Sequence, residues 1–490
     1  MAYKHGAYGK IADSKVTNAA QAGTVAAYIG TAPINLIRGY ADKDLVNMPI
    51  KIADMGDAQS KLGYSENWKK FTLCEPFAEH FDNTVGNVGP IYVVNVLDPA
   101  VHKAAEKTTK ELSFTNKRAE FESSDIILDT FAIADKAEGV DYSLEYNFAK
   151  GTVVVKLLKE DAGDALSATY NTVDVTAITA ETIIGQATEN GEYSGLHALK
   201  LLYQYHNVVL NLLAAPGWSE IPAVYQAMVG IVQRLNGHWD GFVNADIPLT
   251  DAEGAAIDTL AKAKAWKLAN GYTSERSKAC WPQRKDARGR VLHTSTAVQS
   301  TMLRVDLSHD GVPFESPSNK EIMATCQYFG EGSKNKGFDQ QTANELNESG
   351  ITTLCFWGGR WVLWGPHTAA YTYGGDVDGR AIFDVNIRML MYITNGFQLR
   401  HGTKIDTPMT PQLKDTILNV EREHLDSLSG VGALIGTPTV AFVESANPES
   451  DMMNGDFVWD CSATPTPPFK SGTNRVSYTD EGFAAFFGNE

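Results

Sequence analysis

The sequence predicts a multidomain α/β (α+β) protein with a mixed-sheet core, an inserted all-β domain and extended arms at both ends. Its 490 residues exceed what one compact core accommodates, so several folding units are expected. Apolar runs of strand length alternate with helical patterns along most of the chain, which favours βαβ units. A middle window changes composition, and both ends lack the apolar face that a separate core would need.

Residues 1–20 are predicted to form an extended N-terminal arm. They are polar and rich in Gly and Ala, with only a short alternation of apolar and polar residues. Residues 21–100 follow as the first part of the core. The apolar runs 23–30 and 90–97 predict buried strands, and helical patterns begin near Asp57 and cover 71–81.

Residues 101–190 are predicted to form an inserted outer β domain. The window 102–190 holds none of the nine tryptophans and none of the five cysteines, and it carries 9 Lys and Arg against 16 Asp and Glu. Alternating segments at 141–148 and 152–158 flank a turn and indicate a hairpin. Such an acidic, alternating unit is expected on the outside of a larger body.

Residues 191–345 are predicted to complete the core. Helices at 195–205 and 221–235 alternate with strands at 207–213 and 241–247, and Thr250 or Asp251 could cap a further helix. Because parallel strands need long crossover connections, this alternation implies a mostly parallel sheet.

Residues 346–465 are predicted to be the C-terminal unit, and its most distinctive part is a tryptophan-rich stretch at 346–368. Trp357, Trp361 and Trp364 surround a Gly-Gly turn, which favours a β-hairpin whose strands enter the core. The alternative is a ligand pocket, because aromatic side chains bury much area at little entropic cost. The hairpin strands are expected at 352–356 and 362–364, and helices at 384–398 and 411–428.

Residues 466–490 are predicted to be an extended C-terminal arm. A proline-rich spacer at 464–468 stiffens the chain where the arm begins. The apolar segments beyond it, 475–478 and 483–487, are too short to make a core. Their side chains must therefore be buried against something else.

Composition excludes several classes of function. A formal net charge of −17 argues against a nucleic-acid partner, because phosphate binding needs concentrated Lys and Arg. Five cysteines without paired spacing indicate neither a disulfide framework nor a zinc site, and we expect them to be small buried residues of a reducing compartment. Neither a signal peptide nor a membrane span is indicated. The expected location is therefore the cytoplasm, and any partner is expected to be protein.

The motifs that usually mark catalysis are incomplete in this chain, so no catalytic, cofactor-binding or metal-binding residue is assigned. The glycines at 430, 432 and 436 are misspaced for a dinucleotide loop and follow a helix. Ser194 lacks the spacing of a nucleophile elbow. His424 has no second histidine to complete a zinc helix.

Several stretches together resemble the contractile tail sheath proteins of myophages and phage-tail-like bacteriocins. Near the start these are 5–8, 22–33 and 93–99, and the return from the inserted domain resembles the family at 174–185. The resemblance covers essentially the whole chain, and the order of the motifs is more specific than any one of them. The later motifs are 212–217, 315–319, 346–351, Trp364-Gly365, 386–388, 432–436 and 454–458.

The resemblance implies a subunit that stacks as hexameric rings around a tail tube and contracts to drive the tube through a target envelope. Its partners would be itself, the tail tube protein, and the baseplate and tail terminator proteins, in a particle assembled in the host bacterial cytoplasm. The tryptophan-rich stretch is then interpreted as the packed hub of a C-terminal assembly domain. The alternatives are an α/β enzyme with an inserted β domain and a static self-assembling shell protein.

Two sets of residues are expected to make contacts in such an assembly. Terminal arms with strand-like patterns can add a strand to a neighbour's sheet, and charged residues of helix 411–428 can face the tube through charge complementarity. The tube-facing residues would be Lys414, Glu421 and Arg422. The arm residues would be Tyr8, Ile11, Val16, Arg475, Val476, Tyr478, Phe483, Phe486 and Phe487.

Overall fold

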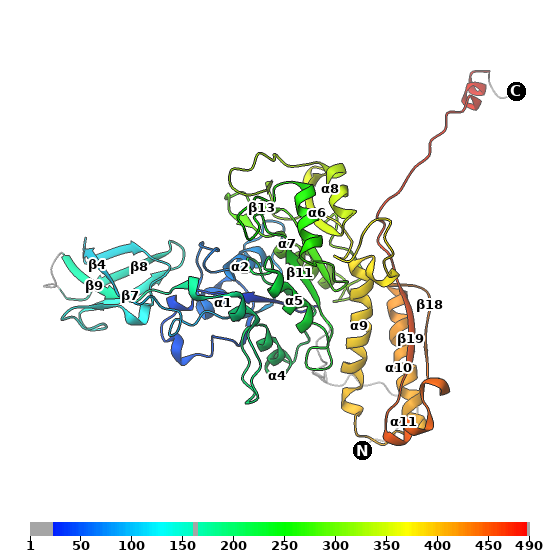
Figure 1. Ribbon diagram of the computed structural model, residues 1–490, viewed down its shortest axis with the longest axis horizontal. Helices are drawn as coiled ribbons and strands as arrows, with labels where there is room; N and C mark the ends of the chain where they lie inside the picture. Colours follow the sequence, from blue (N-terminus) through cyan, green and yellow to red (C-terminus); the bar gives the residue numbers. More distant parts are fainter. Residues whose placement is uncertain (1–22, 160–164, 488–490) are drawn as a thin grey trace, which may run out of the picture.

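The computed structural model describes residues 23–159 and 165–487, and an eight-stranded sheet forms its centre (Figure 1). The strand order is β17-β16-β12-β11-β10-β1-β3-β2. The inner strands from β16 to β3 run parallel, and β17 and β2 close the two edges antiparallel. The predicted mixed-sheet α/β fold is thus confirmed. The strands are β1 Ala26–Gly30, β2 Pro49–Ile52, β3 Ile91–Asn95, β10 Leu212–Ala214, β11 Phe242–Asp246, β12 Ser277–Cys280, β16 Ile351–Trp357 and β17 Arg360–Trp364.

The strands expected from continuous apolar runs lie at the centre of the sheet. Every residue of β1 and β3 is buried, as a strand covered on both faces requires. The strand expected at 207–213 joins the sheet only from Leu212. Asn207 ends the preceding helix in the left-handed conformation, with φ 53°, so the chain must turn before it can pair.

Helices cover the central sheet and pack on one another. The long helix α7 (Thr294–Leu307) lies across β1, β10, β11 and β12, α2 (Cys74–Phe81) packs on α7, and α1 (Met55–Leu62) packs on α2. The helix expected at 195–205 is instead a 3-10 helix over Gly195–Leu201 followed by α4. The remaining elements of the body are α3 Ala180–Ile184, α4 Leu202–His206, α5 Pro222–Ile231, α6 Leu260–Ala269, α8 Gln340–Asn347, and the small sheet of β13 Gln283–Lys285, β14 Val291–Leu292 and β15 Cys326–Tyr328.

A β unit projects from the body at the left of Figure 1 and has a hydrophobic core of its own. Its strands form two three-stranded sheets, and β7 and β8 make the expected hairpin. Leu36 of the body enters the core of this unit, and the buried side chain of Asn35 donates hydrogen bonds to the carbonyls of Ser124 and Ile126 at 3.0 and 2.8 Å. The unit is therefore held to the body by packed contacts. Its strands are β4 Thr108–Ser113, β5 Arg118–Glu122, β6 Ala132–Ile133, β7 Tyr142–Asn147, β8 Thr152–Leu157 and β9 Ala165–Tyr170.

The C-terminal module comprises residues 384–465 and lies on the opposite side of the body from the β unit (Figure 1). Two long helices, α9 and α10, run beside a two-stranded antiparallel sheet. Their apolar faces enclose a separate core that includes Met389, Leu425 and Leu434. The elements are α9 Asp384–His401, α10 Pro411–Gly430, β18 Leu434–Ala441, α11 Glu449–Asn454 and β19 Asp460–Pro465.

The predicted tryptophan-rich hairpin is confirmed, but its tip is not packed. Trp357 pairs with Arg360 across the turn, and the inner residues Leu354 and Leu363 are buried. At the tip, Phe356 and Trp357 remain 55% and 49% exposed. The base of the hairpin is therefore packed within the subunit, whereas its tip has no cover among the described residues.

Two further expectations concern cysteines and membrane insertion. Cys74, Cys280 and Cys355 are buried as expected, whereas Cys326 and Cys461 are exposed because they lie on short edge strands. Among the described residues, no helix combines the length and the apolar character that crossing a bilayer requires.

Candidate assembly surface

Helix α9 is attached to the body through a buried ion pair. Asp384, the first residue of α9, lies 2.9 Å from the ammonium group of Lys278 on β12, and both side chains are fully buried. The same ammonium group donates to the carbonyls of Gly365 and His367, at 2.9 Å each. A buried charge is tolerated only when it is paired and hydrogen-bonded. Lys278 therefore ties the central sheet, the loop after the hairpin and the C-terminal module together.

A second buried pair lies one turn further along α9. Arg388 contacts the Asp306 carboxylate near the end of α7, and both side chains are buried. The Thr24 hydroxyl donates to the same carboxylate at 2.6 Å. Burial raises the pKa of Asp306 above its ordinary value, although Arg388 and Thr24 oppose the shift. One carboxylate thus joins the start of β1, helix α7 and helix α9.

Helix α10 presents fewer free charges than the sequence predicts. Glu421 is buried and accepts hydrogen bonds from Arg400 and His401 of α9, at 2.6 Å to each residue. Burial alone would raise its pKa, but these donors lower the pKa of Glu421 to about 2. The expectation that Glu421 faces a partner is corrected, because this carboxylate holds α9 and α10 together. Arg422 is exposed, and half-buried Lys414 pairs with Asp415 at 2.9 Å.

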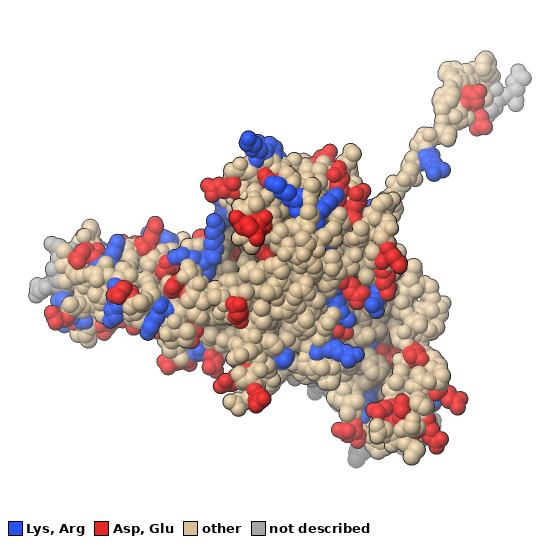
Figure 2. Space-filling view, in the orientation of Figure 1, with Lys and Arg blue, Asp and Glu red and all other residues tan. Residues whose placement is uncertain are grey.

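The sheet of the C-terminal module has two free edges among the described residues. β18 pairs only with β19, so each strand leaves one row of backbone groups without a strand partner. The surface of this sheet includes the exposed side chain of Ile435. At the far end of the module, a group of acidic side chains surrounds α11 (Figure 2). Open edges are templates for pairing with another chain. The acidic group comprises the exposed residues Glu444, Glu449, Asp451 and Asp456.

The chain leaves the module as an exposed tail, defined here as residues 466–487. Thr466 still bonds to Ala433 and Gly432, but every residue from 469 to 487 is exposed. Figure 1 shows the tail projecting away from the body to a short 3-10 helix, η9 (Glu481–Phe487). The predicted arm residues Arg475, Val476, Tyr478, Phe483, Phe486 and Phe487 all lie on it, whereas Tyr8, Ile11 and Val16 fall outside the described residues.

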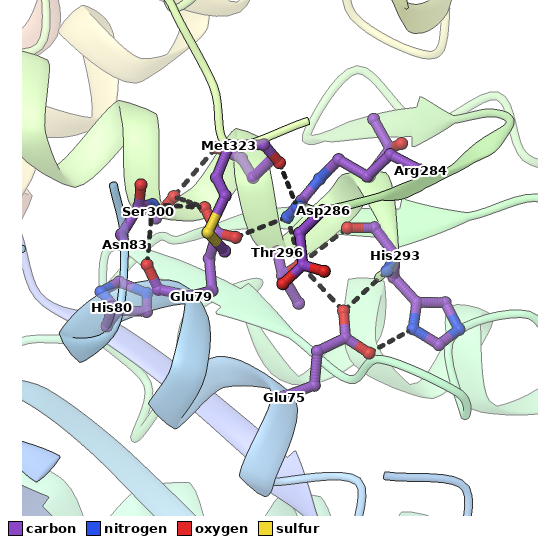
Figure 3. A network of polar contacts seen from close by, with 12 residues as sticks. Glu75, Glu79, His80, Asn83, Arg284, Asp286, His293, Thr296, Ser300 and Met323 are labelled. Carbon is purple, nitrogen blue, oxygen red and sulfur yellow. Dashed lines mark hydrogen bonds and ion pairs between the residues drawn. The ribbon is translucent and has the colours of Figure 1, made fainter. Parts of the chain in front are cut away.

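A buried polar network joins α2 to α7 and β13 in the body (Figure 3). Glu79 lies 2.6 Å from Arg284 and accepts a hydrogen bond from Ser300 at 2.8 Å. Glu75 accepts from Thr296 at 3.0 Å and lies 2.7 Å from the His293 ring. These carboxylates are occupied by protein donors, so the arrangement holds the helices together. Among the described residues, no group of His, Cys, Asp and Glu is placed to hold a metal ion.

This network was missed by sequence reasoning because its members come from segments about 200 residues apart. The only signal was the polar content of α7, where Thr296, Gln299 and Ser300 occupy positions that a sheet-covering helix usually fills with apolar residues. Such a pattern indicates buried polar partners, but it does not identify them.

His293→Gln is expected to destabilise the protein by about 2 kcal/mol near pH 6, because it removes a charged hydrogen-bond partner of Glu75. Burial alone would lower the pKa of His293, but Glu75 and Glu220 raise it well above the ordinary value, whereas His293 and Arg284 hold the pKa of Glu75 down against burial. The contribution of His293 to the free energy of unfolding is fully present below pH ~6.5 and is lost as pH rises through its raised pKa. The Glu75 contribution is lost as pH falls below ~4.5.

The measurement is urea unfolding of the wild type and the variant from pH 4 to pH 9. The difference should be largest at about pH 5–6.5 and shrink on both sides. His238→Gln, at an exposed histidine, is the matched control and should show no such maximum. A pH-independent difference for His293→Gln would contradict the assignment of the ion pair.

The sequence is similar to those of known proteins over most of its length. It is 27% identical over 469 residues to the tail sheath protein of Burkholderia phage BcepMu, covering 92% of each chain. It is 25% identical over 302 residues to a putative prophage major tail sheath protein of Pseudomonas aeruginosa, covering 62% of this chain and 73% of the relative. No family model matches the sequence.

Solved structures share the fold. A chain from the baseplate of the anti-feeding prophage, solved with sixfold symmetry, superposes with a TM-score of 0.56 at 14% identity and covers 97% of this chain and 99% of that one. A chain from the helical sheath of the same particle in its contracted state gives a TM-score of 0.54 at 14% identity, with the same coverage. At this identity, the likeness concerns the fold.

Proposed function

We propose that this chain, which resembles phage tail sheath proteins in sequence and contractile injection system sheaths in fold, is a structural subunit of a contractile tail sheath. The observation that carries the proposal is the similarity to a tail sheath protein over 92% of both chains. The subunit polymerises as stacked hexameric rings around a tail tube, within a virion or a phage-tail-like particle. Contraction of the sheath drives the tube through the envelope of a target cell.

The C-terminal module and the terminal arms link the subunits of the array. Each free edge of the β18–β19 sheet accepts a strand from a neighbour's arm through backbone hydrogen bonds. Each such bond contributes about 1 kcal/mol net, so the linkage gains strength from repetition across many subunits. Extended arms also let rigid bodies rotate without losing connection. The role is structural and requires no cofactor.

Two lattices of the same protein test this function directly. Electron microscopy of assembled particles should show a long, narrow helical array and a short, wide one built from this chain. A single lattice under all conditions would instead indicate a static shell. Association with a baseplate and a tail terminator at the two ends of the array is part of the same proposal.

A truncation that ends at Pro468 is expected to abolish ordered sheath tubes, because it removes the exposed tail but leaves the folded module intact. Negative-stain images would show monomers or short oligomers in place of tubes. The control is a truncation ending at Phe487, which keeps the whole described tail. Ordered tubes from the shorter chain would overturn the role of the C-terminal arm.

Reversing the charges of Lys414 and Arg422 to Glu is expected to weaken binding to the tail tube by about tenfold or more, because charge complementarity across an interface is lost. Co-sedimentation with tube protein measures the change at low and at high salt. The double variant Lys262→Glu with Lys264→Glu, on α6 of the body, changes the net charge by the same amount and serves as the control. Unchanged binding would remove α10 as the tube-facing helix.

A further inference from the structure

A groove of about 710 Å³ opens beside the exposed tip of the hairpin β16–β17. This groove, which we call the hairpin groove, has an aromatic lining that includes Trp357, Trp364, Tyr371 and Tyr373, together with Phe469 of the tail. The Trp357 and Trp364 rings lie 6.0 Å apart, and the Trp364 indole donates to Asn344 at 2.7 Å. The wall made by these two tryptophans is thus fixed by contacts within the subunit, and residues 468–472 of the tail form another part of the lining.

The exposed rings of this groove have no cover among the described residues. Trp357 is 49% exposed and Tyr373 is 71% exposed, although both are large aromatic side chains. Neighbouring exposed rings on a soluble protein mark an interaction site, whereas singly scattered ones need no explanation. A rigid aromatic wall is also the kind of surface that anchors binding partners.

The tip of the tail also carries large apolar side chains that are exposed. In η9, Phe483, Phe486 and Phe487 are 56%, 82% and 86% exposed, and the segment 469–480 that leads to them is exposed throughout. Three phenylalanines in seven residues cannot bury one another. They need an apolar surface outside their own segment.

We propose that the hairpin groove of one copy of this chain receives the tail tip, residues 481–487, of another copy. The phenylalanine rings of the tip pack against Trp357, Trp364 and Tyr373 of the receiving copy. This inference rests on the proposed function, since it names the surface that an exchanged C-terminal arm reaches.

Lys470 supplies one favourable charge contact for this pairing, although Glu348 also lines the groove. The root of the tail, with Lys470, lines the groove, whereas the tip is preceded and opened by the acidic residues Asp480 and Glu481. The tip of one tail would therefore bring carboxylates to the basic root of the next. Because donor and acceptor surfaces differ, the contact is head-to-tail and repeats along an open array.

The course of the tail favours another copy over the same copy. The tail starts in the groove and then leads away from the body to η9 (Figure 1). The 11 residue-to-residue steps from Gly472 to Phe483 can span about 36 Å when the chain is extended. The tip of the same chain could occupy the groove only by reversing direction onto its own root.

Cysteine cross-linking of the full-length chain tests the proposal. The exposed native cysteines are first replaced (Cys326→Ser and Cys461→Ser), and a Phe486→Cys variant carrying 15N is mixed under assembly conditions with an unlabelled Tyr373→Cys variant. Oxidation should give a product of twice 53.3 kDa. Its cross-linked peptide should join labelled residue 486 to unlabelled residue 373. Val140→Cys, on the outer β unit, replaces Tyr373→Cys in the control and should give no such peptide.

Two results would overturn the proposal. The first uses a variant that carries both Phe486→Cys and Tyr373→Cys in one chain: the proposal fails if its cross-link forms only within single chains. The other is the absence of any link between residues 486 and 373. In addition, Trp357→Ser should weaken association of purified subunits by about 30-fold, as expected for a buried aromatic anchor, while its unfolding curve stays close to that of the wild type. If the wild type forms tubes and Trp357→Ser associates as tightly as the wild type, only the role of the groove as the docking site is refuted. If the wild type does not polymerise, the sheath function is refuted.

Discussion

Replacing Arg388 by methionine is expected to lower the free energy of unfolding by about 3–5 kcal/mol, because it leaves the Asp306 carboxylate buried without its cation. The side chains of Arg388 and Asp306 are 4% and 0% exposed. Without Arg388, Asp306 retains only the Thr24 hydroxyl as a partner and must take up a proton. The loss should therefore be larger at pH 8 than at pH 4. The sign of this pH dependence follows from the raised pKa of Asp306, since stability falls as pH rises above the pKa of the unfolded state.

Denaturant unfolding of the intact chain at both pH values measures this effect. Arg422→Met on α10 is the matched control, because its side chain is exposed and a surface charge contributes about 0.5 kcal/mol or less. The double variant Arg388→Met with Asp306→Asn should recover part of the stability at pH 8. Equal losses for Arg388→Met and Arg422→Met would show that Asp306 does not depend on this contact.

Replacing Lys278 by methionine is expected to have an effect of similar size, about 3–5 kcal/mol, by leaving Asp384 charged and buried. The variant also removes the donor that satisfies the carbonyls of Gly365 and His367. Since Asp384 begins α9, hydrogen exchange should quicken in α9 before it quickens in the central sheet.

Lys262→Met provides the comparison for Lys278→Met. Lys262 pairs with Asp258 at 2.8 Å, but its side chain is 54% exposed, so the expected loss is below about 1 kcal/mol. A second variant, Lys278→Met with Asp384→Leu, should recover much of the loss but not all of it, because two carbonyls stay without a donor. Uniform loosening of the whole chain would contradict the attachment of α9 through Lys278.

Elements with strong local signals could be predicted from the sequence. The apolar runs of β1 and β3 identify buried strands, and the Gly-Gly turn between Trp357 and Arg360 identifies a hairpin. Helix α10 begins after Thr410, whose hydroxyl caps the backbone of Leu413, with proline in the first turn. Such features depend on neighbours in sequence, so they are visible before the fold is known.

The contacts that hold the parts together could not be predicted in this way. Glu421 looks like a surface charge on an amphipathic helix, yet Arg400 and His401 of the preceding helix bury it. Lys278 occupies a central strand, where a charged residue is rare. Its partner Asp384 lies about 100 residues away. The exposed tail could be predicted because it lacks a core, while the groove beside the hairpin depends on loops that only the fold brings together.

The position of Thr24 has a mechanical consequence. Thr24 lies two residues before β1, and its hydroxyl binds the carboxylate that also holds Arg388 of α9. A pulling force applied at Gly23 therefore reaches β1 through the backbone and α9 through the side chain of Thr24. The Asp306 carboxylate thus couples the start of the central sheet mechanically to the C-terminal module.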